Sequence, residues 1–288
     1  MTDARAASFT TRSIKTTAKD AGLRLALSMV DLTTLEGKDS PDKVRSLCAK
    51  ARAPLPAADD VPHVAAVCVY PAMVSAAKEA LDGSGIHVAS VATGFPSGQY
   101  PLSIRLRDTE KAIGDGADEI DMVINRGAFL AGRYGEVAHE IAEVTAVCAA
   151  GGAHLKVILE TGELETYDNV RRASDLAIEH VRAGDFIKTS TGKVSPAATM
   201  GVTLVMLEAI RDAWLSEGKR IGMKPAGGIR TAKQSLHYLA MLKETLGDEW
   251  LTPELFRFGA SSLTDDILRQ IVRRRTGVYP AMHDFGIA

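Results

Sequence analysis

The sequence predicts a single (β/α)8 TIM barrel of the α/β class, with a short N-terminal extension. About eight short runs rich in Val, Ile and Phe alternate with helix-length amphipathic segments along the 288 residues. No long linker or change of composition divides them, and an open doubly wound sheet of this length would normally hold fewer strands. We therefore assign residues 23–275 to one barrel, residues 1–22 to a flexible or helical arm and residues 276–288 to a C-terminal tail.

The predicted strands are short apolar runs that are rich in β-branched side chains and bounded by turn residues. They are expected at residues 25–33, 64–70, 87–94, 119–125, 154–160, 185–190, 221–228 and 256–261. Between them, apolar residues recur at i, i+3 and i+4, the period of an amphipathic helix.

Capping residues predict where several of these helices begin and end. Helix starts are expected at Ser40, which precedes Pro41, and at Thr231. Helix ends are expected at three glycines, Gly151, Gly184 and Gly218. The poorly patterned residues 51–62 are expected to form a loop.

The composition favours small-molecule chemistry over binding to nucleic acid or membranes. The chain has 34 Lys and Arg against 36 Asp and Glu, so it has no basic excess for a phosphate backbone. No run approaches about 18 uncharged apolar residues. Cys48, Cys68 and Cys148 form no CxxC pair, and three widely spaced thiols suit a reducing compartment, so we expect a cytoplasmic protein.

Lysines in three consecutive predicted strands carry the main chemical signal. Lys156, Lys188 and Lys224 lie in the fifth, sixth and seventh strands, where burying an unpaired ammonium costs several kcal/mol. Any one of them could be a surface lysine, but three near the carboxyl ends of strands indicate a reaction site. Neighbouring parallel strands run about 4.8 Å apart, so Lys188 and Lys224 at matching heights would repel, and the pKa of one would fall below about 10.4.

A neutral lysine amine adds to a carbonyl and forms an imine, which accepts the electrons of a carbanion on the next carbon. This carbon–carbon bond chemistry requires no metal. Asp121, in the fourth predicted strand, is the candidate carboxylate for proton transfer, although it could instead only pair with a lysine. The residues alone do not rank Lys188 above Lys156 as the reacting amine.

Two glycine-containing loops predict a phosphate site. KPAGGIRT follows the seventh predicted strand and FGASS follows the eighth, and both precede helices. In barrels these two loops commonly bind phosphate through N–H groups at helix starts, although tight turns also need glycine. The residues assigned to this site are Gly227, Gly228, Arg230, Gly259, Ser261 and Ser262.

Other segments do not complete the motif that they resemble. TGK at residues 191–193 is followed by Val194 instead of the Ser or Thr of a P-loop. HEIAE at residues 139–143 has Glu143 where a zinc motif needs its second histidine. Cys68 could be a nucleophile, but a buried thiol without an obvious histidine partner is typically inert. We therefore expect no metal site.

Seven segments, taken in order, resemble those of deoxyribose-phosphate aldolase, a family of class I aldolases with a (β/α)8 barrel. They are VDLTTL, VCVYP, GADEIDMVIN, LKVILETGEL, DFIKTSTGK, KPAGGIRT and RFGASSL. The resemblance covers residues 25–270, and DFIKTSTGK and KPAGGIRT are its most specific segments. It implies reversible cleavage of 2-deoxy-D-ribose 5-phosphate to D-glyceraldehyde 3-phosphate and acetaldehyde through a lysine Schiff base, with no metal or organic cofactor.

The resemblance also implies roles for single residues. Lys188 would form the Schiff base, Lys224 would depress its pKa and assist proton transfer, and Asp121 would relay protons. Asp31 and Lys193 would support the site and touch substrate hydroxyls. The other substrate-binding residues, which include those that would hold the phosphate, are Thr191, Gly192, Gly227, Gly228, Arg230, Gly259, Ser261 and Ser262.

The implied partners are a small phosphorylated sugar and, in a homodimer, a second copy of the chain, with no nucleic acid and no membrane. Some family members end in a tyrosine that assists proton transfer, whereas here Tyr279 lies nine residues before Ala288, so the part played by the tail is open.

A rival hypothesis is a phosphosugar isomerase or epimerase that uses Asp31 and Asp121 as a carboxylate pair and forms no covalent adduct. A third is a sugar-phosphate sensor that binds without turnover.

Overall fold

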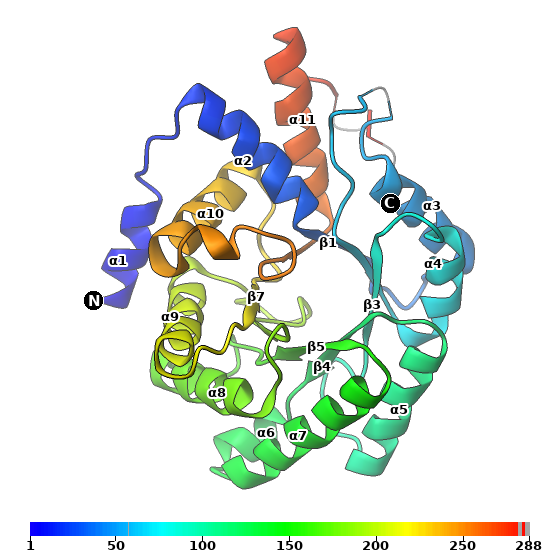
Figure 1. Ribbon diagram of the computed structural model, residues 1–288, viewed down its shortest axis with the longest axis vertical. Coiled ribbons are helices and arrows are strands. Elements are labelled where there is room, and N and C mark those ends of the chain that lie inside the picture. Colours follow the sequence, from blue (N-terminus) through cyan, green and yellow to red (C-terminus); the bar gives the residue numbers. More distant parts are fainter. Residues whose placement is uncertain (57, 282–283, 286–288) are drawn as a thin grey trace.

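The computed structural model describes residues 1–56, 58–281 and 284–285, and its centre is a barrel of parallel strands (Figure 1). All eight strands belong to one sheet, in the order β7-β6-β5-β4-β3-β2-β1-β8. They are β1 (Val30–Thr33), β2 (Ala66–Val69), β3 (His87–Val91), β4 (Glu119–Val123), β5 (His154–Ile158), β6 (Phe186–Lys188), β7 (Gly222–Lys224) and β8 (Phe258–Ala260). The predicted (β/α)8 barrel is confirmed.

The barrel closes between β7 and β8, where fewer backbone pairs join the strands than between the other neighbours. Two isolated parallel bridges, Met223 to Phe256 and Ala226 to Gly259, link these strands, whereas each other neighbouring pair has a continuous ladder of at least three residue pairs. Further backbone hydrogen bonds cross the same seam, for example from the N–H of Arg257 to the carbonyl of Met223 at 3.0 Å.

A ring of helices covers the outside of the barrel (Figure 1). The elements that follow the eight strands are α3 (Pro41–Arg52), η1 (Pro71–Met73), α4 (Val74–Ala80), α5 (Leu102–Gly114), α6 (Arg126–Leu130), α7 (Tyr134–Ala150), α8 (Tyr167–His180), α9 (Met200–Glu217), α10 (Ala232–Leu246), η2 (Asp248–Trp250) and α11 (Ser262–Thr276). The connections from strand to helix therefore gather at one end of the barrel, where the carboxyl ends of the strands lie.

Most predicted helix caps are confirmed. The Ser40 hydroxyl accepts the N–H of Lys43 at 3.3 Å, and Thr231 forms a capping box with Gln234. Gly151 and Gly218 follow the last residues of α7 and α9. The stop predicted at Gly184 is wrong, because α8 already ends at His180, where the next residue turns to extended backbone. The predicted loop at residues 51–62 also starts too early, since α3 continues to Arg52.

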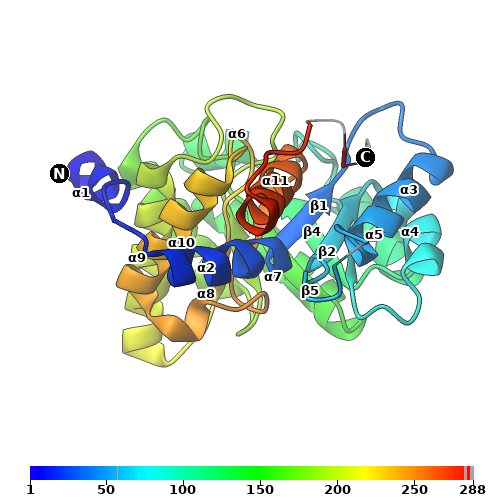
Figure 2. The ribbon, with the colours of Figure 1, turned by 90° about the horizontal axis from the view of Figure 1, so that it is seen from above.

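The first 28 residues contain two helices, α1 (Thr2–Phe9) and α2 (Thr16–Ser28). The strand predicted at 25–33 is therefore wrong in its first five residues, because α2 runs to Ser28, with Met29 as its C-cap, and buries Leu23, Ala26 and Leu27 on one face at helical spacing. The predicted boundary between arm and barrel falls inside α2. In Figures 1 and 2, α1 lies beside α9, while α2 crosses the outside of α10 and α11.

The two faces of β2 show how the core is divided. Val67 and Val69 point outward and belong to the large apolar cluster between sheet and helices, whereas Ala66 and Cys68 belong to a small cluster inside the barrel. Alternating direction along a strand produces this division. On β4, β5, β6 and β7 the inward positions carry charged side chains instead, and these form the site described next.

Candidate active site

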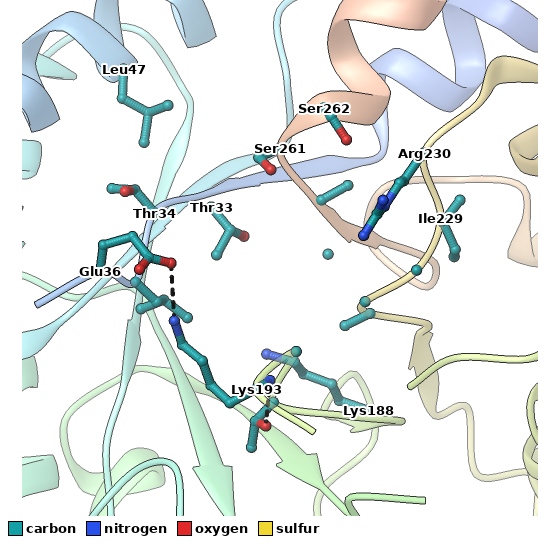
Figure 3. A pocket seen from close by; sticks show the side chains of 18 of the residues that line it. Thr33, Thr34, Glu36, Leu47, Lys188, Lys193, Ile229, Arg230, Ser261 and Ser262 are labelled. Atoms are coloured by element: carbon teal, nitrogen blue, oxygen red, sulfur yellow. Dashed lines mark hydrogen bonds and ion pairs between the residues drawn. The ribbon is translucent and has the colours of Figure 1, made fainter. Parts of the chain in front are cut away.

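A cavity of about 400 Å³ opens at the carboxyl ends of the strands (Figure 3). Among its walls are most of the residues that the sequence assigns to a site: Lys188, Thr191, Gly192, Lys193, Gly227, Gly228, Arg230, Gly259, Ser261 and Ser262. Three assigned residues, Asp31, Asp121 and Lys224, are fully buried below it. The cavity thus joins the end of β6 to the loops after β7 and β8.

Lys188 and Lys224 occupy matching heights, as the strand spacing predicts. They are direct partners in the register of β6 and β7. Both bind the same carboxylate oxygen, because Asp121 Oδ2 lies 2.7 Å from Lys188 Nζ and 2.8 Å from Lys224 Nζ. The two amines are therefore held close together by one atom, and of the two only Lys188 is part of the cavity wall.

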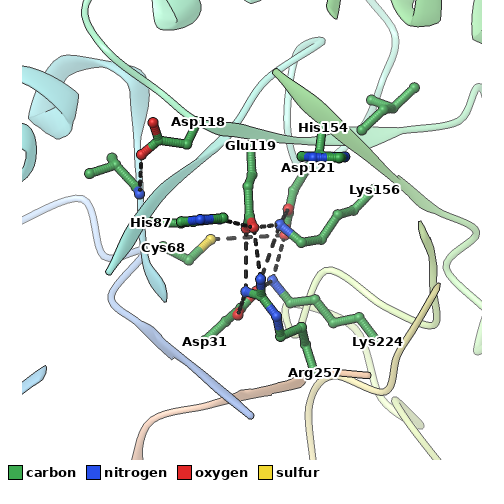
Figure 4. Close-up of polar contacts among 12 residues, drawn as sticks. Asp31, Cys68, His87, Asp118, Glu119, Asp121, His154, Lys156, Lys224 and Arg257 are labelled. Carbon is green, nitrogen blue, oxygen red and sulfur yellow. Dashed lines mark hydrogen bonds and ion pairs between the residues drawn. The ribbon is translucent and has the colours of Figure 1, made fainter. Parts of the chain in front are cut away.

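Below the cavity, Asp121 and Lys224 belong to a larger buried ionic network (Figure 4). Asp31 Oδ2 lies 2.5 Å from Lys224 Nζ, and Asp31 Oδ1 accepts a hydrogen bond of 2.7 Å from Arg257 Nη1. Arg257 Nη2 also donates to Glu119 Oε1 at 2.9 Å. Asp31 thus pairs with Lys224 and Arg257 and, at 3.8 Å, with Lys156, and its contact with a substrate hydroxyl stays a prediction.

Lys156 completes this network from β5. Its ammonium group donates to Glu119 Oε2 and, at 3.2 Å, to Asp121 Oδ1. Lys188 is part of the cavity wall and Lys156 is not, which separates the two as candidates for reaction with a substrate in the cavity. The geometry therefore ranks the two lysines, which the strand pattern alone could not do.

The network contains equal numbers of fixed positive and negative charges. Burial favours the neutral form of each group, but the nearby opposite charges favour the charged form more strongly. The pKa values of the three carboxyls are therefore lowered, and those of the three cations are raised. The carboxylates are Asp31, Glu119 and Asp121, and the cations are Lys156, Lys224 and Arg257. The group is electrically neutral when Lys188 is a free amine.

The pKa of Lys188 is lowered, in contrast to those of Lys156 and Lys224. Burial is the largest cause, and the charge of Lys224 adds to it, while the Asp121 carboxylate opposes both. The repulsion predicted between the two lysines is thus present, but it is smaller than desolvation. Since a free amine is the nucleophilic form, Lys188 is suited to addition to a carbonyl.

The loops after β6, β7 and β8 shape the other wall of the cavity. Gly192, Gly227 and Gly228 have φ values of 81°, 80° and 85°, a region that side chains disfavour. A Cβ atom at Gly259 would lie 2.7 Å from Ala226 Cβ and 3.1 Å from Lys224 Cε, so the missing side chain leaves room for Lys224. Helix α11 begins at Ser262, and its first N–H groups add a positive end at this wall.

Comparison with known proteins agrees with this geometry. A family model described as DeoC/LacD family aldolase matches residues 25–266. The chain belongs to the DeoC/LacD family of aldolases. A Mus musculus protein named deoxyribose-phosphate aldolase is 50% identical over 283 residues, which cover 95% of this chain and 88% of that protein.

Solved structures share the fold of this DeoC/LacD aldolase. A crystal structure of a protein from Toxoplasma gondii ME49 has a TM-score of 0.78 at 25% identity and covers 92% of this chain and 100% of that chain. A deoxyribose phosphate aldolase from Aeropyrum pernix, described as tetrameric, has a TM-score of 0.66 at 22% identity, over 89% of this chain and 93% of that chain. The second likeness shows the fold alone.

Sequence reasoning missed several residues of this candidate site. Glu119 and Arg257 hold the lower half of the ionic network. Glu119 lies two residues before Asp121 on β4 and therefore faces the same side, a signal that alternation offers. Glu160 was also missed: its carboxylate accepts hydrogen bonds from the backbone N–H and the hydroxyl of Thr191 and so fixes the loop after β6.

Two other side chains considered from the sequence, those of Cys68 and Tyr279, lie outside the cavity wall of this aldolase. Cys68 Sγ is 3.9 Å from Asp121 Oδ2, and burial together with that carboxylate raises its pKa to about 11, which leaves a neutral thiol at pH 7. The Tyr279 ring packs on the outside of α11, with its centroid 4.6 Å from the guanidinium of Arg273, and it is not part of the cavity wall.

Two absences hold for the described part of the chain. It contains no group of three or more His, Cys, Asp or Glu side chains arranged to hold a metal ion. Within those same residues, no helix combines the length and the apolar character needed to cross a bilayer.

Proposed function

We propose that the chain is a class I aldolase that reversibly cleaves 2-deoxy-D-ribose 5-phosphate to D-glyceraldehyde 3-phosphate and acetaldehyde. The observation that carries the proposal is the position of Lys188, which lies in the cavity wall above Lys224 and Asp121 and has a lowered pKa. Membership of the DeoC/LacD family and 50% identity to a deoxyribose-phosphate aldolase support the same reaction.

Imine formation is the first step that the site supports. The lone pair of Lys188 Nζ attacks the C1 aldehyde carbon of the sugar, and the carbinolamine oxygen leaves as water after it gains a proton. Asp121 and Lys224 are placed to move that proton, because Asp121 Oδ2 contacts both amines. The product is a protonated imine between Lys188 and C1.

Cleavage of the C2–C3 bond follows. The C3 hydroxyl loses its proton and becomes a carbonyl, while the C2–C3 electron pair moves toward the imine to form an enamine. D-Glyceraldehyde 3-phosphate leaves, C2 is then protonated, and addition of water to the resulting imine releases acetaldehyde and restores the Lys188 amine. The carboxylate of Asp121 is charged before the substrate binds, because the three lysines around it lower its pKa, so it is ready to accept a proton during the reaction.

The phosphate of the substrate is assigned to the opposite wall of the cavity. The backbone at Gly227, Gly228 and the start of α11 supplies N–H groups there. Arg230 adds a positive charge on this side, whereas Lys193 is placed elsewhere along the cavity and pairs with Glu36 at 3.1 Å (Figure 3). A sugar that reaches from Lys188 to this wall would carry its phosphate at the end far from C1.

Arg230→Gln is expected to raise KM for 2-deoxyribose 5-phosphate by about 10-fold or more, since one charge-assisted contact to phosphate contributes roughly 1.5–3 kcal/mol. KM for unphosphorylated 2-deoxyribose should change little. Lys233→Gln is the matched control, because Lys233 is an exposed cation three residues further on that is not part of the cavity wall. Equal effects on both sugars would contradict the phosphate assignment.

Reductive trapping tests the reaction type. Incubation with acetaldehyde and cyanoborohydride, followed by digestion and mass spectrometry, is expected to place one ethyl group on Lys188 and none on Lys156 or Lys224. An isomerase or epimerase on the same scaffold would form no such adduct. Isomerisation of a phosphosugar with no modified Lys188 would therefore refute the aldolase and favour the rival.

We further propose that the enzyme works as a homodimer in the cytoplasm. The three cysteines are buried and free, as suits a reducing compartment. The exposed side chains of Tyr100 and Ile104 flank a largely apolar depression beside α5, which would suit a contact between two copies.

A further inference from the structure

A second cavity, of about 460 Å³, opens at the opposite end of the barrel from Lys188. It lies at the amino-terminal ends of the strands, because it is lined by the first residues of β3, β4, β5 and β6. Its charged and titratable residues are His63, His87, Glu119, His154, Glu254 and Arg257. We call this opening the floor cavity.

An unbroken series of polar contacts joins the floor cavity to the reacting amine, and Figure 4 shows the part of it from His87 to Asp121. His87 Nδ1 lies 2.8 Å from Glu119 Oε1, and Glu119 Oε2 accepts a hydrogen bond from Lys156. Lys156 Nζ in turn lies 3.2 Å from Asp121 Oδ1, and Asp121 Oδ2 accepts from Lys188 Nζ at 2.7 Å. The first side chain of the series is 46% exposed, and the intermediate ones are buried.

We propose that His87 is a positioning residue for the reaction, whose charge at the floor of the barrel sets, through Glu119, Lys156 and Asp121, the fraction of Lys188 that is a free amine. The inference rests on the proposed function, in which Lys188 is the nucleophile. It concerns a residue on the far side of the barrel from the substrate.

The charge balance of the network gives the direction of this effect. With His87 neutral, the three buried carboxylates match Lys156, Lys224 and Arg257, so the network is neutral when Lys188 is a free amine. A proton on His87 adds one positive charge, and each further positive charge disfavours a proton on Lys188. Because the intervening groups are buried, salt and water screen this interaction less than they would at a surface.

The groups that face His87 bear on how it titrates. The pKa of His87 is raised, because its hydrogen bond to Glu119 has a larger effect than burial, which lowers the pKa. The charge of Asp118 also raises this pKa, and the charge of Arg257 lowers it. Asp118 is itself paired with Lys78 at 2.6 Å.

The remaining titratable groups of the floor cavity bind elsewhere or belong to other elements. His154 lies 3.7 Å from Asp185, His63 Nδ1 contacts the carbonyl of Val64, and Glu254 accepts from the hydroxyl of Thr252. Of the three histidines, the one whose ring contacts a carboxylate of the network is His87.

The test uses two substitutions of opposite effect on charge at the same position. His87→Gln removes the titratable charge, and His87→Lys makes a positive charge permanent. The side chain is half exposed, so neither substitution places a new group in the apolar core. The measured quantity is the rate at which acetaldehyde and cyanoborohydride modify Lys188 as a function of pH, since acetaldehyde has no phosphate whose titration would interfere.

The pH midpoint of Lys188 modification is expected to be highest in His87→Gln, intermediate in the unaltered protein and lowest in His87→Lys, with about one pH unit between the two variants. His154→Gln and His154→Lys are matched controls, because His154 lines the same cavity but pairs with Asp185, and they should leave the midpoint unchanged. A purely structural role for His87 would shift both variants in the same direction.

Two results would overturn the inference: the same midpoint in His87→Gln as in the unaltered protein, or shifts of the same sign in both His87 variants. The first can be read from His87→Gln alone, should His87→Lys fail to fold. Absence of any adduct on Lys188 in the unaltered protein is a different result, since it would refute the proposed function itself.

Discussion

Lys188→Met is expected to lower kcat/KM for cleavage of 2-deoxyribose 5-phosphate by roughly 10⁴-fold or more, because it removes the proposed nucleophile. The barrel should stay folded, with a change in the free energy of unfolding of about 1–2 kcal/mol. Methionine has a similar length, and Asp121 keeps its contacts with Lys156 and Lys224 when the third amine is lost. Steady-state kinetics and urea unfolding measure the two quantities.

Lys233→Met is the matched control, because the same substitution on the surface should leave both kcat/KM and stability unchanged. Residual turnover above about 1% in Lys188→Met, with the fold intact, would assign the imine to another amine. Reductive trapping of that variant with acetaldehyde would then identify the lysine that reacts.

Lys224→Leu is expected to move the acid limb of the pH–rate profile upward by about one pH unit or more. Its removal leaves three buried carboxylates with two fixed cations, so a proton on Lys188 becomes favourable and the pKa of that amine rises. The free amine, and with it activity, would then appear only at higher pH. A pKa that is higher by one corresponds to about 1.36 kcal/mol in favour of the protonated amine.

The same variant should be less stable by about 3–5 kcal/mol, because two buried carboxylates, Asp31 and Asp121, lose a partner. Adding Asp31→Asn would restore the balance of fixed charges. The double variant Asp31→Asn, Lys224→Leu is therefore expected to return the midpoint toward that of the unaltered protein, although the proton-transfer role of Lys224 is not restored. An unchanged midpoint in Lys224→Leu would show that its charge does not act on Lys188.

Several features of the site follow from sequence pattern and strand geometry. The matching heights of Lys188 and Lys224 follow from the position of each lysine in its apolar run, because parallel strands of a barrel share their carboxyl ends. The glycines of the loops after β7 and β8 are predictable for a similar reason, since loops at those places face one cavity.

Other features could not be predicted because they depend on tertiary contacts. Nothing local distinguishes Arg257 from a surface arginine at a strand start, yet it reaches Asp31 and Glu119 across the barrel interior. Leu25 to Ser28 read as strand because they continue the apolar run of β1, but burial of Leu23, Ala26 and Leu27 in the core on one helical face keeps them in α2. The strand pattern also could not show that Lys156 is sealed beneath the cavity while Lys188 reaches it.

The few backbone pairs between β7 and β8 make the buried ion pairs important for the closure of the barrel. Lys224 and Arg257 stand on either side of that closure, and both bind Asp31 of β1. The ion pairs that we propose to control the pKa of Lys188 therefore also link β1 to the two strands between which the backbone ladder is weakest. If the proposed function holds, stability and reactivity depend on the same three side chains, and a substitution that changes one of these properties should change the other.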